Sequence, residues 1–215
     1  MTSGKVGVIR FLGTNCDADV KKWLEGQSFR TEYLWYEDRF DIKDYEMVVL
    51  PGGFSHGDYL RCGALAARTA VMKSVKEFAD SGKPVLGICN GFQILCEARL
   101  LPGALLKNKN LKFKDEWVTL KVKNEKTPFS RQLKSEQSIK LPIAHGEGCF
   151  YADTDDLKAL QDFDQIWLSY EKNPNGSLSD IAGIVNRQGN VCGLMPHPER
   201  ALATWMGSSD GALFL

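Results

Sequence analysis

Residues 87–91 place a cysteine between two glycines, where an expected buried strand gives way to a helix. The run reads Gly-Ile-Cys-Asn-Gly, with Cys89 at its centre. The glycines allow the sharp strand-to-helix turn that presents a nucleophile, and the start of the following helix favours a thiolate. The pattern therefore predicts cysteine-based acyl transfer. The alternative is a structural cysteine in the core, where most free cysteines lie.

A thiolate needs a histidine, because the leaving amine must gain a proton and the attacking water must lose one. His197 lies in the run Met-Pro-His-Pro-Glu, directly after an expected strand. Both prolines favour extended backbone, so Glu199 projects to the same side as His197 and can accept a hydrogen bond from the ring. Glu199 is thus expected to orient His197, as the third member of a triad does. A proline-rich surface turn is the alternative.

Acyl transfer also requires donors for the developing oxyanion. Pro51, Gly52 and Gly53 follow an apolar strand and supply amides that side chains do not block. The carboxyl ends of parallel strands are where such sheets place ligands. We expect the backbone amides of Gly53 and Asn90 to form the oxyanion hole. Without the cysteine, a simple strand-terminal turn would explain the glycines equally well.

The elements that must position these residues alternate between short apolar strands and helices. Strands are expected at 6–9, 47–50 and 84–88, with helical patterns at 18–24, 71–79 and 92–96. Short strands that are buried on both faces and alternate with helices favour an α/β fold with an open, mostly parallel sheet flanked by helices.

The second half of the chain has a different pattern. From Glu116 onward apolar and polar residues alternate around 118–122 and 139–143, which predicts an antiparallel β extension, and 181–185 and 191–195 are expected to form two strands joined by a turn. The polar segments 107–114 and 123–137 are interpreted as exposed connections. No linker is evident, so we expect a single domain spanning residues 1–215.

Composition excludes several classes of function. The 27 basic and 27 acidic residues balance, which indicates no general attraction to nucleic acid or to a membrane surface. No apolar run approaches a membrane span or a signal peptide, so a cytoplasmic location is expected. The six cysteines form no CxxC pair, so we expect reduced thiols and no metal site. The chain also lacks a GxxxxGK[ST] phosphate loop.

Together, the cysteine elbow, the Pro-Gly-Gly loop and the His-Pro-Glu run resemble the triad-type (class I) glutamine amidotransferases. More specific runs resemble the glutaminase subunits of phosphoribosylformylglycinamidine synthase; they lie at 13–17, 54–61, 144–148, 170–177 and 196–201. The likeness extends from Val6 to about Gly211. Leu12 departs from the pattern, since proline is expected before Gly13, and this puts only the local turn geometry in doubt.

The resemblance implies a flavodoxin-like amidotransferase fold and a role for each matching residue. Cys89 would be the nucleophile, His197 the general base and acid, and Glu199 the residue that orients His197. The resemblance also implies residues that bind glutamine, namely Gly52, Gln93, His145 and Gly146.

By the same resemblance, this subunit hydrolyses glutamine and delivers ammonia to a separate ATP-dependent synthetase subunit, which makes formylglycinamidine ribonucleotide in purine biosynthesis. No cofactor is expected in this chain, whereas ATP and Mg²⁺ are expected on the large synthetase subunit, and a small third subunit is also expected. The alternatives are an amidotransferase of guanylate or imidazole synthesis, a γ-glutamyl hydrolase that acts alone, and an inactive scaffold subunit. The run at 54–61 argues against the first two.

Overall fold

The computed structural model describes residues 4–215, and a nine-stranded sheet forms its centre. The strands lie in the order β2-β1-β3-β4-β11-β10-β9-β6-β7. Their bounds, in that order, are Arg30–Trp35, Lys5–Arg10, Met47–Leu50, Val85–Ile88, Val191–Leu194, Ile181–Val185, Ile166–Tyr170, Lys114–Val122 and Ser138–His145. A separate pair joins β5 (Ala104–Leu106) and β8 (Cys149–Tyr151).

The first part of the sheet is parallel, because β2, β1, β3, β4 and β11 pair in parallel register. Every residue of β3 and β4 is buried, as expected for strands covered on both faces. Helix α1 (Asp17–Gly26) packs on β1 and β2, and α3 (Asn90–Glu97) packs on β3, β4 and β11. Helix α2 spans Ala70–Asp80 and α4 spans Thr154–Asp162. This arrangement confirms the predicted α/β fold.

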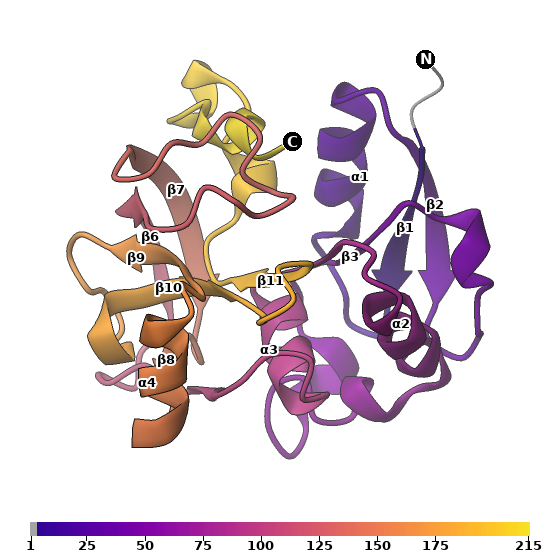
Figure 1. Cartoon of the computed structure of the whole chain (residues 1–215), viewed down its shortest axis with the longest axis horizontal. Helices are drawn as coiled ribbons and strands as arrows, with labels where there is room; N and C mark the ends of the chain where they lie inside the picture. The colour runs from indigo at the N-terminus through magenta and orange to yellow at the C-terminus, as the bar shows by residue number, and fades with distance from the viewer. Residues whose placement is uncertain (1–3) are drawn as a thin grey trace.

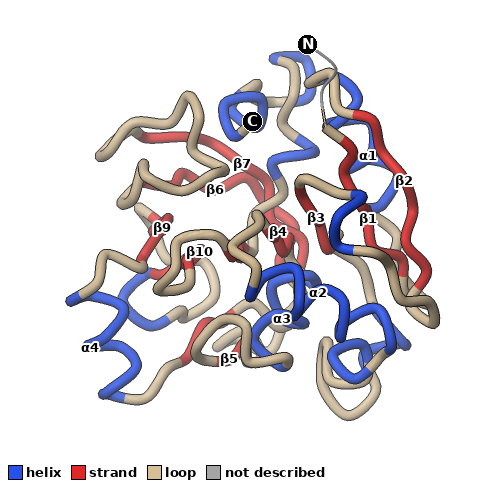
Figure 2. Tube along the Cα trace, turned by 45° about the vertical axis from the view of Figure 1, so that its right-hand side comes forward, coloured by secondary structure: helices blue, strands red, loops and turns tan. Residues whose placement is uncertain are grey.

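The second part of the sheet is antiparallel, from β11 through β10, β9 and β6 to β7. Val118, Leu120 and Val122 of β6 are buried while Thr119 is exposed, so the alternation in the sequence reflects one covered face. Figure 1 shows the early strands on one side of the molecule and this extension on the other, with α3 near the middle. Figure 2 shows the same strands from a second angle. The predicted antiparallel extension is therefore confirmed.

Buried side chains of both parts pack into one continuous core. Its largest fully buried members include Trp23 of α1, Phe78 of α2, Phe92 of α3 and Trp167 of β9. Each such side chain contributes roughly 1.5–3 kcal/mol of transfer free energy on burial. The core thereby holds the ends of β3, β4 and β11 at fixed positions.

The interpretation of two polar segments as exposed connections was wrong in part. In 107–114, Asn108 is fully buried, and Lys114 already belongs to β6. In 123–137, Phe129 and Leu133 are buried against the core, and Trp167 donates a hydrogen bond from Nε1 to Ser130 Oγ at 2.9 Å. Long-range packing, which local polarity does not report, accounts for both differences. No helix within the described residues has the length and apolar character to span a bilayer.

Candidate active site

Cys89 lies on a tight bend between β4 and α3. Its backbone angles, φ 50° and ψ −105°, fall in a region that non-glycine residues rarely occupy, and such strain is typical of functional sites. Its amide donates to Leu194 O at 2.8 Å, which ties the bend to β11. A Cβ on Gly91 would lie 1.9 Å from Leu50 O, so only glycine lets α3 start this close to β3. The predicted elbow is present.

His197 and Glu199 follow β11 and are both buried. His197 Nδ1 lies 2.6 Å from Glu199 Oε1, and the His197 amide donates to Pro142 O at 2.9 Å. Burial lowers the pKa of His197, but the Glu199 carboxylate and then Cys89 outweigh it, so the net pKa lies well above the ordinary value. Glu199 therefore holds the ring through Nδ1 and favours imidazolium, while Nε2 has no partner among the described residues.

Cys89 and His197 approach each other across Gly52. A Cβ on Gly52 would lie 2.8 Å from His197 Cε1, 3.0 Å from Cys16 Sγ and 3.5 Å from Cys89 Cβ. The Cys89 thiol contacts Ala144 O at 3.7 Å, whereas His197 Nε2 has no hydrogen-bond partner among residues 4–215. Catalytic hydrogen bonds are often formed only when substrate binds. The structure thus brings the expected nucleophile and base together without the direct bond between them.

The two expected oxyanion donors lie on either side of this point. Gly53 has a φ of 149° and forms an antiparallel bridge with Thr14, and a Cβ on Gly53 would lie 2.8 Å from Asn15 N. Asn90 is the first residue of α3, so its amide has no carbonyl partner within the helix. Neither amide donates a backbone hydrogen bond in the described turns and loops. Both remain available to an oxyanion.

The expected glutamine-binding side chain of Gln93 is engaged within the chain. Its Nε2 donates to Glu147 O at 2.6 Å, and its Oε1 accepts from Asn90 Nδ2 at 2.8 Å. Gln93 thereby links the start of α3 to the loop after β7. Direct contact between Gln93 and glutamine stays a prediction.

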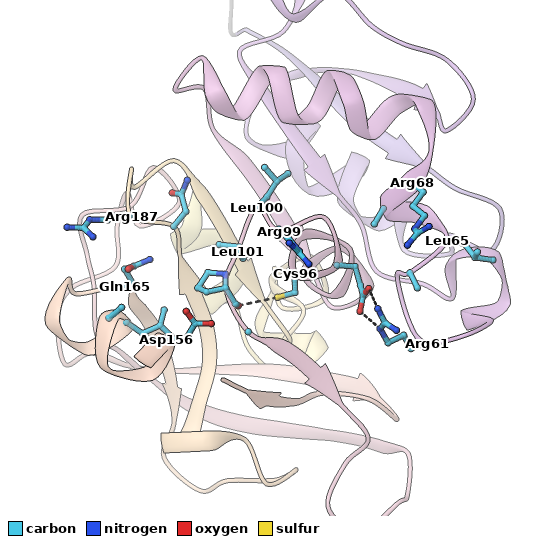
Figure 3. A pocket seen from close by; sticks show the side chains of 18 of the residues that line it. Arg61, Leu65, Arg68, Cys96, Arg99, Leu100, Leu101, Asp156, Gln165 and Arg187 are labelled. Carbon is cyan, nitrogen blue, oxygen red and sulfur yellow. Dashed lines mark hydrogen bonds and ion pairs between the residues drawn. The ribbon is translucent and has the colours of Figure 1, made fainter. Parts of the chain in front are cut away.

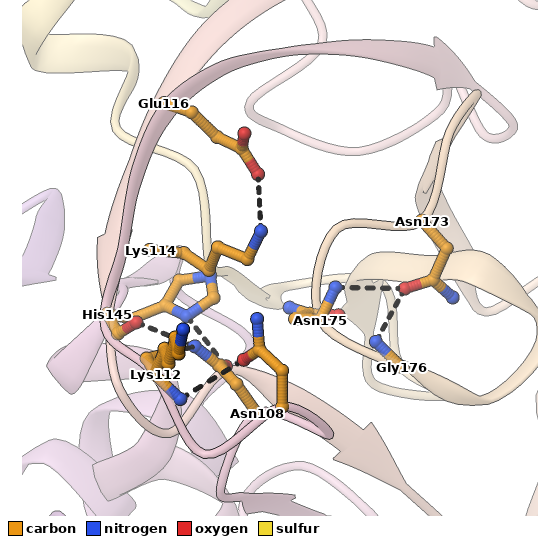
Figure 4. Close-up of polar contacts among 9 residues, drawn as sticks. Asn108, Lys112, Lys114, Glu116, His145, Asn173, Asn175 and Gly176 are labelled. Atoms are coloured by element: carbon orange, nitrogen blue, oxygen red, sulfur yellow. Dashed lines mark hydrogen bonds and ion pairs between the residues drawn. The ribbon is translucent and has the colours of Figure 1, made fainter.

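Asn108 organises the loop that follows β7, and Figure 4 shows Asn108 beside His145. Its Nδ2 donates to His145 O and to Lys112 O, both at 2.8 Å, and its amide donates to Gly146 O at 2.9 Å. Its Oδ1 accepts from Gly148 N and lies 3.1 Å from His145 Nδ1. Every polar group of Asn108 is therefore used to fix this loop. Nothing in the sequence around Asn108 signals this role.

His145 is buried beside this network. Burial, and then the charge on His197, lower the pKa of His145 to about 4, so its ring is neutral near pH 7. Asn108 Oδ1 can accept only from a protonated Nδ1, which leaves Nε2 as an acceptor without a partner among the described residues. The structure thus places the His145 ring close to the site, but the predicted contacts of His145 and Gly146 with glutamine stay predictions.

Cys16 is a second thiol at the site that sequence reasoning did not assign. Arg200 Nη2 donates to Cys16 Sγ at 2.9 Å, and the thiol contacts Asn15 Oδ1 at 3.2 Å. Ligand atoms of Cys16, His197 and Glu199 lie within 4.8 Å of one another, a donor set that could bind zinc. The guanidinium on the same sulfur disfavours a cation there. The run at 13–17 carried the only sequence signal for this residue.

A small cavity of about 160 Å³ lies among these groups. Cys16, Cys89 and His197 line it, together with Gly53, Phe113 and Arg200. Sites for drug-sized ligands are roughly 300–1,000 Å³, so this cavity suits a small substrate. The arrangement can carry out nucleophilic attack on a small acyl compound.

The chain matches a family model described as the CobB/CobQ-like glutamine amidotransferase domain over residues 3–211. The chain belongs to this glutamine amidotransferase family. It is 55% identical over 212 residues to the phosphoribosylformylglycinamidine synthase subunit PurQ of Prochlorococcus marinus subsp. pastoris (strain CCMP1986 / NIES-2087 / MED4), which covers 98% of this chain and 96% of that protein. The predicted family is therefore confirmed.

Solved structures agree with this family. A chain in the structure of PurLQS from Thermotoga maritima superposes with a TM-score of 0.91 at 44% identity, covering 99% of this chain and 95% of that one. A glutamine amidotransferase from the same organism superposes with a TM-score of 0.63 at 21% identity, covering 94% of this chain and 78% of that one. The second likeness supports the amidotransferase fold alone.

Proposed function

We propose that this chain is the glutaminase subunit of a phosphoribosylformylglycinamidine synthase, which hydrolyses glutamine and passes ammonia to a separate synthetase subunit. One observation carries the proposal: the Cys89 elbow faces the His197–Glu199 pair across Gly52. It does so in a chain that is 55% identical to a protein named as a subunit of that synthase.

In the first step, the Cys89 thiolate attacks the side-chain amide carbon of glutamine. The amides of Gly53 and Asn90 stabilise the tetrahedral oxyanion. The carbon–nitrogen bond breaks as His197, which Glu199 keeps protonated, donates a proton to the leaving nitrogen and releases ammonia. A γ-glutamyl thioester remains on Cys89.

In the second step, water attacks the thioester. His197, now neutral, accepts a proton from this water, and the Cys89 thiolate leaves as the carbon–sulfur bond breaks. Glutamate departs, and the imidazolium–thiolate pair is restored. Gly52, Gln93 and the backbone at His145 and Gly146 are proposed to hold the glutamine during both steps.

The proposed partners follow from the chemistry and from the relatives. Conversion of an amide to an amidine consumes ATP, and we assign ATP and Mg²⁺ to the large synthetase subunit and no cofactor to this chain. The name of the Thermotoga maritima complex supports a multi-subunit assembly, so we include a small third subunit. Purine synthesis from water-soluble intermediates suits a cytoplasmic location.

The nucleophile is tested by glutamate release from the assembled complex. Cys89→Ala is expected to abolish release, whereas Cys149→Ala, which replaces a half-buried cysteine on β8, is expected to retain it. A Cys89→Ala complex that still hydrolyses glutamine would overturn the mechanism. Retained glutamine hydrolysis without any binding to the synthetase would instead support a hydrolase that acts alone.

Cys16 offers a second candidate nucleophile because it also lies beside His197. Cys89 is favoured, since Cys16 lacks the positive φ of the elbow and its sulfur accepts a hydrogen bond from Arg200 Nη2. Cys16→Ser is therefore expected to hydrolyse glutamine, with Cys89 still forming the thioester. Loss of the thioester in this variant would favour the second candidate.

A further inference from the structure

Residues 54–60 form a strained and exposed segment directly after the Gly53 oxyanion loop. His56, Asp58 and Leu60 have φ values of 52°, 54° and 71°, in the left-handed region that favours glycine. The side chains of Tyr59 and Leu60 are 73% and 86% exposed. Strained backbone of this kind persists where the surroundings hold it, and it concentrates at functional sites. The segment thus maintains a costly conformation that presents two apolar side chains to solvent.

The segment leads into a groove of about 1110 Å³ at the end of α3 that lies away from Cys89 (Figure 3). Leu60 and Arg61 line the groove on one side, and residues 99–103 and α4 line it elsewhere. Arg61 is held by Glu97, with nitrogen–oxygen distances of 2.5 and 2.7 Å.

Three further guanidinium groups line the groove, those of Arg68, Arg99 and Arg187, and its carboxylates are Glu97, which binds Arg61, and Asp156. Among residues 4–215, none of the three groups has an ion-pair partner. The groove therefore combines an excess of arginines over carboxylates with an apolar rim, on a chain whose overall charge is zero.

The segment is also connected to the catalytic elbow. Ser55 N donates to Asn90 Oδ1 at 3.1 Å, and Asn90 Nδ2 reaches Asp58 Oδ1 at 3.5 Å. Beyond the segment, a Cβ on Gly63 would lie 2.8 Å from Ile94 N, so the chain is pressed against α3. Residues 55 and 58 of the segment are thus hydrogen-bonded to the side chain of Asn90, whose amide is an expected oxyanion donor.

We propose that Tyr59, Leu60, Arg68 and Arg99 form a docking surface for the large synthetase subunit, which contributes an acidic segment bearing an apolar side chain. Charge complementarity selects the chemistry of this segment, because unpaired guanidinium groups favour carboxylates and the rim favours an apolar contact. The likeness to a subunit of a multi-subunit synthase selects the partner. Docking fixes residues 54–60 and thereby sets the amides of Gly53 and Asn90 for glutamine hydrolysis. This inference rests on the proposed function and assigns the surface through which assembly acts.

The test titrates the intact chain with purified synthetase and third subunit, and measures binding and glutamate release together. Leu60→Asp and the double variant Arg68→Glu/Arg99→Glu are each expected to raise the Kd by about tenfold or more. The midpoint of activation should move with the Kd. Two controls match these changes: Leu111→Asp, at a 78% exposed leucine that is also left-handed, and Arg30→Glu, at an exposed arginine outside the groove.

Both controls should bind within about twofold of the parent chain, and thermal unfolding checks that every variant is folded. A Kd within about twofold for both test variants overturns the proposal. The proposal is also overturned if the parent chain forms dimers through Leu60 and the Leu60→Asp variant still binds the synthetase normally. The binding measurement does not depend on catalysis. Glutamine hydrolysis by the Cys89→Ala variant would therefore refute the catalytic mechanism but leave the measured Kd values, and the docking proposal, unaffected.

Discussion

Replacing Gly52 by alanine would place a methyl group between the side chains that are proposed to carry out catalysis. The added Cβ would lie 2.8 Å from His197 Cε1 and 3.0 Å from Cys16 Sγ, closer than carbon contacts allow. Gly52 does not have a left-handed φ, so alanine fits its backbone and the effect is purely steric. The His197 ring must move, although its amide and Nδ1 are both held.

The magnitude follows from the size of this displacement. Inserting a methyl group into a packed site costs roughly 1–3 kcal/mol of stability. A misplacement of about 1 Å in a catalytic group costs about 10²-fold in rate. We therefore expect Gly52→Ala to lower kcat/KM for glutamine by about 10²-fold or more, with a smaller effect on folding.

The assay is glutamate release by the assembled complex, together with thermal unfolding of the isolated chain. Gly26→Ala is the matched control, because a Cβ at this position of α1 meets nothing within 4 Å. That control should keep full activity and gain about 0.4–1 kcal/mol of stability from reduced freedom of the unfolded chain.

A Gly52→Ala complex with kcat/KM within about threefold of the parent would refute this reasoning. That value corresponds to less than 1 kcal/mol of transition-state free energy. The His197 ring would then not lie against Gly52 during catalysis.

Three further variants test the surrounding groups. Between pH 6.5 and about 4, His145 binds a proton in the unfolded chain but not in the folded one. As the pH falls through this range, the free energy of unfolding measured with urea should therefore decrease by about 3 kcal/mol more for the parent than for His145→Gln. Equal decreases would contradict the lowered pKa. Because the pKa of His197 is raised, the stabilisation it receives from Glu199 is complete below about pH 6.5 and is lost as pH rises through the raised pKa. The stability gap between the parent and Glu199→Gln should therefore shrink at alkaline pH, and a constant gap would count against the pair. Asn108→Ala leaves several buried groups without hydrogen-bond partners, so calorimetry should show that the free energy of unfolding falls by about 3 kcal/mol. A decrease of less than about 1 kcal/mol would refute the structural role of Asn108.

The sequence was informative where chemistry and conformation are encoded by neighbouring residues. The glycines beside Cys89 signalled the elbow because the close approach of α3 to β3 requires them. The prolines beside His197 signalled extended backbone, and Glu199 lies where that geometry places it. Alternating apolar residues identified β6 and β7 because one face of each strand is covered.

Roles that depend on distant contacts were not predictable. Arg200 reaches Cys16 across 184 positions of sequence, and Asn108 reaches His145 across 37. Phe129 and Leu133 lie in a polar segment and are nevertheless buried, and Trp167 of β9 packs beside Phe129 and donates a hydrogen bond to Ser130. Gly52 was expected to bind substrate through its family likeness, but its contacts with His197 and Cys89 emerge only after β3, β4 and β11 have come together.

The most direct test of the catalytic assignment is the position of a covalent label. The assembled complex would be treated with a glutamine analogue that alkylates active-site thiols, digested, and analysed by peptide mass spectrometry. Stoichiometric label on Cys89, prevented by excess glutamine and absent from the other five cysteines, is the expected result. Label on Cys16 with Cys89 unmodified, or no glutamine-protected label on either, would contradict the assignment of Cys89 as nucleophile.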